Sequence, residues 1–111
     1  MNDHTIEQEI QAKGLTAPRV TPADIEANIV AEYGFTAHTA TEGMPRRDEL
    51  KLLTFYVLVL QNGFTVTGES ACASPENFDA EIGYKIARAN AVQKIWPLMG
   101  YALKQKLSEV P

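Results

Sequence analysis

The chain has few of the residues on which metal sites and disulfide frameworks depend. Its 111 residues include one cysteine, Cys72, and two histidines, His4 and His38. A single cysteine excludes an internal disulfide. The histidines are far apart in sequence, and no carboxylate cluster lies near them, so the metal-ligand spacing is missing. We therefore expect no metal and no cofactor, and the cysteine usage is typical of a protein from a reducing cytoplasm.

Long apolar segments and complete catalytic motifs are also missing. The apolar run around residues 57–60 extends over about ten residues, whereas a membrane helix needs about twenty. The first residues are acidic, with Asp3, Glu7 and Glu9, and do not have the basic-then-apolar order of a signal peptide. Residues 68–72, Gly-Glu-Ser-Ala-Cys, lack the closing glycine of a nucleophile elbow. We therefore expect no membrane span, no catalytic residues and no enzyme activity.

The charge is acidic overall and unevenly distributed. The net charge is −4, and residues 1–50 hold nine acidic and four basic side chains. Residues 76–111 hold four acidic and five basic side chains. A general nucleic-acid binder is usually basic. Nucleic-acid binding is therefore an unfavourable hypothesis, although a local basic helix face leaves DNA binding open as a third one.

The strongest structural signal is a β-hairpin within residues 50–73. Two β-rich stretches flank Asn62-Gly63, a dipeptide that favours a two-residue turn. With such a turn, Val59 faces Val66 and Val57 faces Gly68. This register places Phe55, Val57 and Val59 on the face that packs against helices.

The same register places Tyr56, Leu58 and Leu60 on the second face, opposite Thr65, Thr67 and Glu69. That face is too apolar for plain solvent, and a two-stranded hairpin is marginal by itself. Either a third strand or a second subunit is then needed. We expect a homo-oligomer.

Helical signals precede and follow the hairpin. Thr5–Lys13 reads as a short helix that ends at Gly14, and Thr21-Pro22 opens a second helix that runs to about Tyr33. Residues 35–49 are small and polar, which predicts a long flexible surface loop.

The last segment carries an apolar stripe at steps of three and four residues. Its members are Phe78, Ile82, Ile86, Ala89, Val92, Trp96, Met99, Leu103 and Leu107. Pro97 predicts a kink rather than a break, because the stripe keeps its phase across it. The fold class is therefore α+β, in one domain over residues 1–111: a hairpin or small antiparallel sheet packed on one long kinked C-terminal helix, with two short N-terminal helices.

Several polar and aromatic residues are candidates for ligand binding, each with a structural alternative. The long helix presents a cationic side that suits an anionic small molecule or an acidic protein patch, but a solvated helix face explains it too. Polar residues alternate on one strand face, and aromatic rings nearby offer stacking surfaces. Arg19, between two prolines, either pairs with Asp79 or Glu81 or is presented to a ligand. The candidates are Arg19, Tyr56, Thr67, Glu69, Tyr84, Lys85, Arg88 and Lys94.

Five stretches of the chain resemble a family of small phage and prophage proteins, typified by gene product forty-nine of one podovirus and gene product sixty-six of another. The stretches are residues 17–22 (Ala-Pro-Arg-Val-Thr-Pro), 53–55 (Leu-Thr-Phe), 62–71 (Asn-Gly-Phe-Thr-Val-Thr-Gly-Glu-Ser-Ala), 76–83 (Glu-Asn-Phe-Asp-Ala-Glu-Ile-Gly) and 94–101 (Lys-Ile-Trp-Pro-Leu-Met-Gly-Tyr). Tyr84 and Met99 depart from the pattern, where a basic and an acidic residue are expected. The resemblance implies a phage-encoded accessory protein made in the host cytoplasm, and it implies no known enzyme.

Two hypotheses about function follow. The first is a non-enzymatic binder that counters a host defence, for example by sequestering a nucleotide-derived immune signal through the cations and aromatic rings named above. The alternative is an inhibitor that docks on a host defence or regulatory enzyme.

Overall fold

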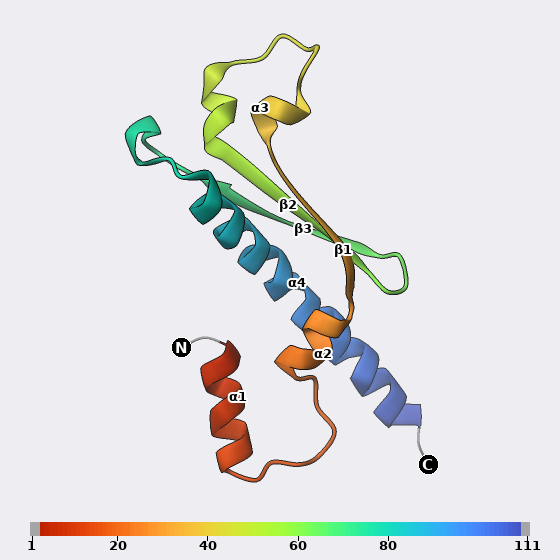
Figure 1. Cartoon of the computed structure of the whole chain (residues 1–111). Helices are drawn as coiled ribbons and strands as arrows, with labels where there is room; N and C mark the ends of the chain where they lie inside the picture. The colour runs from red at the N-terminus through yellow and green to blue at the C-terminus, as the bar shows by residue number, and fades with distance from the viewer. Residues whose placement is uncertain (1–2, 110–111) are drawn as a thin grey trace.

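A three-stranded antiparallel sheet and one long helix form the body of the protein. The computed structural model describes residues 3–109. Strands β1 (Ile29–Thr36), β2 (Leu53–Leu60) and β3 (Thr65–Ala71) lie in the order β1-β2-β3. Helix α4 (Ala80–Glu109) crosses one face of the sheet, and α1 (Asp3–Ala12) and α2 (Pro22–Ala27) lie on the same side (Figure 1). The predicted α+β class, with one long C-terminal helix and two short N-terminal ones, is confirmed.

The second helix is shorter than predicted, and strand β1 follows it as a third strand beside the hairpin. Thr21 caps α2 through a reciprocal pair of bonds with Asp24, of 2.9 and 3.1 Å, as the sequence indicated. The helix ends at Ala27 instead of Tyr33, and Ile29–Thr36 pairs with β2. This stretch is rich in β-branched and aromatic residues, which favour a strand once a partner strand is available. The third strand that the hairpin needs is therefore supplied by the chain itself.

The segment predicted as a loop over residues 35–49 is largely ordered structure. Phe35 and Thr36 complete β1, and the Thr36 side chain caps a short helix, α3 (Ala37–Ala40). A 3₁₀ turn, η1 (Asp48–Leu52), leads into β2, so only residues 41–47 form the connection. Ala37 is buried, which anchors this segment to the end of the sheet.

The hairpin register differs by one residue from the prediction. Gly63 has φ +88°, its N–H donates to the Leu60 carbonyl (2.9 Å), and the Leu60 N–H donates to the Phe64 carbonyl (2.8 Å). These bonds close a three-residue loop in which the glycine takes the left-handed position. Leu58 therefore lies opposite Val66, and Tyr56 lies opposite Gly68. A shift of one residue moves every side chain of a strand to the other face.

The buried face of the sheet is consequently the one that carries Leu58 and Leu60. Both side chains are buried in a core with Val66 and with Ile95 of α4. The predicted inner face was wrong, because Phe55, Val57 and Val59 lie on the opposite side.

Helix α4 rests on the sheet through small residues. Gly83, Ala87, Ala91 and Ile95 are its buried positions, and the helix is continuous through Pro97. The predicted stripe is wrong in its first half, since Ile82 and Ile86 are 55% and 47% exposed. Periodicity favoured the largest apolar side chains, whereas a helix lying close to a sheet buries the smallest ones.

Helix α1 is attached mainly by polar contacts, with no fully buried residue of its own. The Arg19 guanidinium donates to both carboxylate oxygens of Glu7, at 2.5 and 2.7 Å, so the expected pairing with Asp79 or Glu81 is wrong. The Trp96 indole N–H donates to Asp3 at 3.0 Å. The Arg19 bonds lower the pKa of Glu7 from 4.5 to about 2.

These contacts predict that α1 detaches in acid before the sheet unfolds. A carboxyl group whose pKa is lowered in the folded state stabilises above its ordinary pKa of 4.5, and this contribution is lost as pH falls toward about 2. Trp96, the single tryptophan, reports on the docking, so its fluorescence should shift to the red over this range while far-UV circular dichroism changes little. In Glu7→Gln the same shift should already be present at pH 7. An acid transition that Glu7→Gln leaves unchanged would contradict the assignment to Glu7.

Candidate functional site

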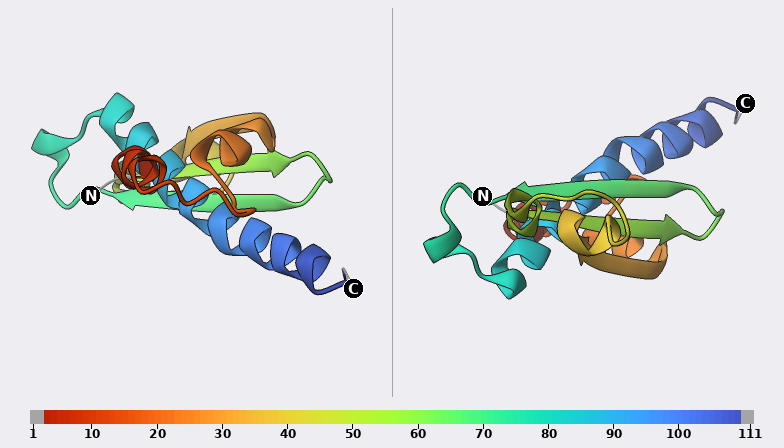
Figure 2. Two further views of the ribbon diagram at one scale, coloured as in Figure 1. Left: turned by 90° about the horizontal axis from the view of Figure 1, so that it is seen from below. Right: turned by 90° about the horizontal axis from the view of Figure 1, so that it is seen from above.

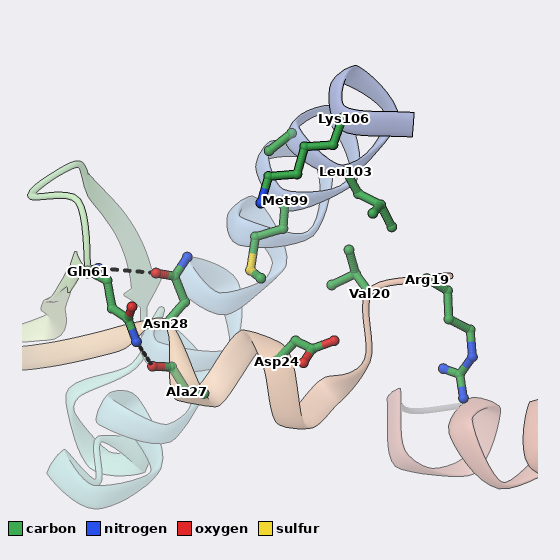
Figure 3. A pocket seen from close by; sticks show the side chains of 10 residues that line it. Arg19, Val20, Asp24, Ala27, Asn28, Gln61, Met99, Leu103 and Lys106 are labelled. Atoms are coloured by element: carbon green, nitrogen blue, oxygen red, sulfur yellow. Dashed lines mark hydrogen bonds between the residues drawn. The ribbon is translucent and has the colours of Figure 1, made fainter. Parts of the chain in front are cut away.

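A cleft of about 400 Å³ opens between the segment around α2 and the C-terminal half of α4 (Figure 3). Small-molecule sites in proteins have volumes of roughly 300–1,000 Å³. Residues from the extended segment 19–20, from α2, from the hairpin loop and from α4 line it. They are Arg19, Val20, Asp24, Ala27, Asn28, Gln61, Met99, Ala102, Leu103 and Lys106.

The cleft has an apolar interior and a polar wall. Val20 faces Met99 and Leu103 across the opening (Figure 3). On the wall, the Gln61 backbone N–H donates to Asn28 Oδ1 (3.1 Å), and its side-chain amide donates to the Ala27 carbonyl (2.7 Å). The first bond orients the Asn28 side chain through its oxygen, so its Nδ2 group is a donor that a ligand can use.

Of the three charged groups at the cleft, only Arg19 has an ion-pair partner among the described residues, and Lys106 is the one cation left without one. The Asp24 carboxylate accepts from the Thr21 N–H, and the Arg19 guanidinium turns toward α1, where Glu7 holds it (Figure 3). Lys106 runs back along α4 toward Met99, and it makes no ion pair within residues 3–109 (Figure 3). The cleft therefore combines an apolar interior, one available ammonium group and one available amide.

Three of the predicted ligand residues meet elsewhere, around Glu32 of β1. Arg88 donates to Glu32 (2.9 Å) and to Glu26 (3.1 Å), and the Tyr56 hydroxyl donates to Glu32 (2.6 Å). The Tyr84 ring lies edge-on to Tyr56, with centroids 6.4 Å apart. Arg88 and Tyr56 together lower the pKa of Glu32, and Glu32 in turn raises the pKa values of both.

This cluster joins three elements and leaves little cationic charge for a ligand. Arg88 connects α4 to Glu26 of α2 and to Glu32 of β1, and its single charge meets two carboxylates. Gly34 of β1 packs directly against the Tyr84 ring, since a Cβ added at Gly34 would lie 2.8 Å from the nearest ring atom. We assign the cluster to fixing α2 and β1 against α4.

The remaining predicted residues are dispersed. Lys85 pairs with Glu81 at 3.4 Å on the exposed side of α4, and Lys94 is exposed further along the helix. Thr67 and Glu69 point from the other face of the sheet, because Gly68 takes the position opposite Tyr56. The structure thus divides the eight candidates among four places, and only Arg19 lines the cleft.

Sequence reasoning missed the residues that give the cleft its character: Asn28, Gln61, Met99 and Lys106. Met99 and Leu103 were assigned to the core stripe of the long helix. No local signal in the sequence shows that α4 continues past the sheet. In that part of the helix Met99 and Leu103 lie opposite the segment around α2 and not against the sheet. The cleft depends on that tertiary placement.

The described part of the chain shows no group of three or more metal-ligating side chains. None of its helices is long and apolar enough to cross a membrane. Cys72 is half-buried and donates to the Ser74 carbonyl at 3.2 Å, which is the setting of a structural thiol.

Comparison with known proteins gives one match. No curated protein and no solved structure is significantly similar to the chain. The model of one family matches residues 20–107, a range that includes all three strands, α4 up to residue 107 and every cleft residue except Arg19. The family is described as phage protein (N4 Gp49/phage Sf6 gene 66). Because the match covers most of the chain, and because the predicted resemblance agrees with it, this protein belongs to the N4 Gp49/phage Sf6 gene 66 family of phage proteins.

Proposed function

We propose that this phage protein is a non-enzymatic accessory factor that counters a host defence by sequestering an anionic small molecule of the nucleotide class in the cleft of Figure 3. The observation that supports the proposal is the unpaired Lys106 beside an apolar interior. A nucleotide has an anionic phosphate and a flat base whose two faces pack against apolar groups, and those two parts suit an ammonium group and the Met99–Val20–Leu103 surface. Asn28 Nδ2 offers a further hydrogen bond. The cluster around Arg88 is not the proposed site.

Binding and its dependence on Lys106 test this proposal. Isothermal titration with cyclic dinucleotides, cyclic trinucleotides and ADP-ribose derivatives should identify a ligand. Lys106→Glu should weaken its binding between tenfold and a hundredfold, because a charge-assisted bond contributes about 1.5–3 kcal/mol and each 1.4 kcal/mol is a factor of ten.

A matched control lies on the same helix. Lys104→Glu makes the same charge change two residues away, at a position that does not line the cleft, and it should leave the affinity within about twofold. Equal losses in both variants would indicate long-range charge instead of a contact. If the wild-type chain binds none of the probes, the small-molecule proposal is overturned.

A protein inhibitor is the second candidate, and one observation favours it. The end of α4 runs past the sheet (Figure 2), and Tyr101 on its outward side is 76% exposed. Leu98, one turn earlier, is exposed as well. An unpartnered apolar helix face is the feature that helix-in-groove recognition uses.

Phage growth on cells with a nucleotide-signalled defence separates the two candidates. Expression of the wild-type chain should restore growth. If the cleft carries the function, Lys106→Glu loses this protection and Tyr101→Glu keeps it. The reverse pattern would support the protein-inhibitor candidate.

A further inference from the structure

The face of the sheet opposite α4 has the composition of a buried surface. Its members, read from the strand pairing, are Ala31, Tyr33 and Phe35 of β1, Leu53, Phe55, Val57 and Val59 of β2, and Thr65, Thr67, Glu69 and Ala71 of β3. We call this set the outer face. An antiparallel sheet with one face in water normally places polar residues there. Only β3 largely follows that rule, because every outer position of β1 and β2 is apolar.

Little of the chain itself covers this face. Helix α3 and the connection that follows it lie at one end, near the stacked rings of Phe35 and Phe55, whose centroids are 5.8 Å apart (Figure 2). Among the described residues no other helix lies over it. Tyr33 is 58% exposed, whereas Phe35, Phe55, Val57 and Val59 are half-buried. A sheet that is apolar on both faces needs a second layer.

The chain as a whole exposes more surface than a compact monomer does. The chain exposes 7775 Å², whereas a compact monomer of its mass exposes about 6,100 Å². The radius of gyration is 17.6 Å, compared with about 13 Å for a compact domain of this length. This excess belongs to the whole elongated molecule, with extents of 58 × 29 × 18 Å, and it is larger than the roughly 800 Å² that each partner contributes to a standard stable interface.

The low charge of the outer face permits a second copy of this chain as the partner. The protein has a net charge of −4, so two copies repel each other unless they meet where charges are few. The outer face has one charged residue among eleven, Glu69, and it lies on the edge strand β3. In a two-fold symmetric dimer both subunits use the same surface patch. A two-fold axis over β1 and β2 would bring the apolar positions of the two copies together and leave Glu69 at the rim of the interface.

We propose that the protein is a homodimer in which the outer faces of two sheets pack against each other over β1 and β2. The two sheets then form the centre of a four-layer arrangement, with an α4 on each outside surface. Sheets packed in this way lie about 10 Å apart. The dimer leaves both clefts exposed, so it does not depend on the proposed ligand function.

Molar mass in solution tests the dimer. Size-exclusion chromatography with light scattering should give twice the monomer mass of 12.2 kDa at micromolar concentrations. Tyr33→Glu changes an exposed side chain on an edge strand, so the fold should tolerate it, and it should shift the mass to 12.2 kDa. Val57→Thr keeps the branched shape of the side chain and places a hydroxyl group in the proposed interface. It should raise the dissociation constant of the dimer at least tenfold.

Tyr101→Glu is the matched control, because it places the same charge on an exposed tyrosine of α4, away from the sheet. It should leave the dimer intact. The proposal is overturned if the wild-type chain remains at 12.2 kDa up to about 100 µM, because the dissociation constant would then be weaker than roughly that concentration. It is equally overturned if Tyr101→Glu dissociates the dimer while Tyr33→Glu and Val57→Thr do not, since the interface would then lie on the helix.

Discussion

Gly68→Ala is expected to lower the free energy of unfolding by about 3 kcal/mol or more, the upper range for overpacking. A Cβ at Gly68 would overlap the carbonyl oxygen of Ala87 and the amide nitrogen of Ala91, and it would lie 3.0 Å from the Asn90 carbonyl carbon. These are backbone atoms of α4 and cannot rotate away as a side chain could. The helix must therefore move off the sheet. Thermal denaturation followed by circular dichroism should show a melting temperature lower by roughly 10–20 °C.

Gly100→Ala provides the matched control for this substitution. Gly100 lies inside α4, and nothing comes within 4 Å of an added Cβ. Alanine in a helix interior is about 0.5–1 kcal/mol more favourable than glycine, so this variant should be slightly more stable than the wild type. Equal stability of Gly68→Ala and the wild type would show that α4 does not approach β3 as closely as described.

Leu58→Ala is expected to cost about 2–5 kcal/mol in urea denaturation, because it leaves a cavity in the core. The Leu58 side chain is fully buried between the sheet and α4. This loss should not depend on protein concentration, since it arises within one subunit.

Val57→Ala separates the two possible hairpin registers. Val57 lies on the outer face, so its truncation should cost less than Leu58→Ala, and in the proposed dimer its cost should grow with protein concentration. The register expected from the sequence requires the opposite ranking. A larger loss for Val57→Ala than for Leu58→Ala, measured at low concentration, would therefore contradict the observed pairing.

The sequence by itself determined the parts of the fold that depend on local chemistry. Thr21-Pro22 specifies a helix start, because the threonine side chain and Asp24 satisfy free backbone N–H groups within one turn. Asn62-Gly63 specifies a reversal, because glycine accepts the positive φ that the loop requires. The long C-terminal helix follows from its period and length, and the family follows from five short stretches that resemble it.

Tertiary structure decided what local chemistry left open. The strand Ile29–Thr36 forms because β2 offers it a partner, and no residue within it encodes that partner. The hairpin register depends on the hydrogen bonds that close the loop between Leu60 and Phe64. Gly68 determines which face of the sheet packs against α4, because only a glycine at that position lets the helix backbone approach the strand so closely.

The candidate site was decided at the same level. The sequence suggested a ligand site formed by several basic residues along α4. In the structure Arg88 forms ion pairs with two glutamates, whereas Lys106 lines a cleft without an ion-pair partner in the described part of the chain. Whether a charged side chain is free depends on which carboxylates the fold brings within about 4 Å of it, and those carboxylates lie far away in the sequence. Local sequence determines where helices start and where turns lie, whereas the end of α2, the buried faces, the strand registers and the unpaired charges depend on the packed molecule.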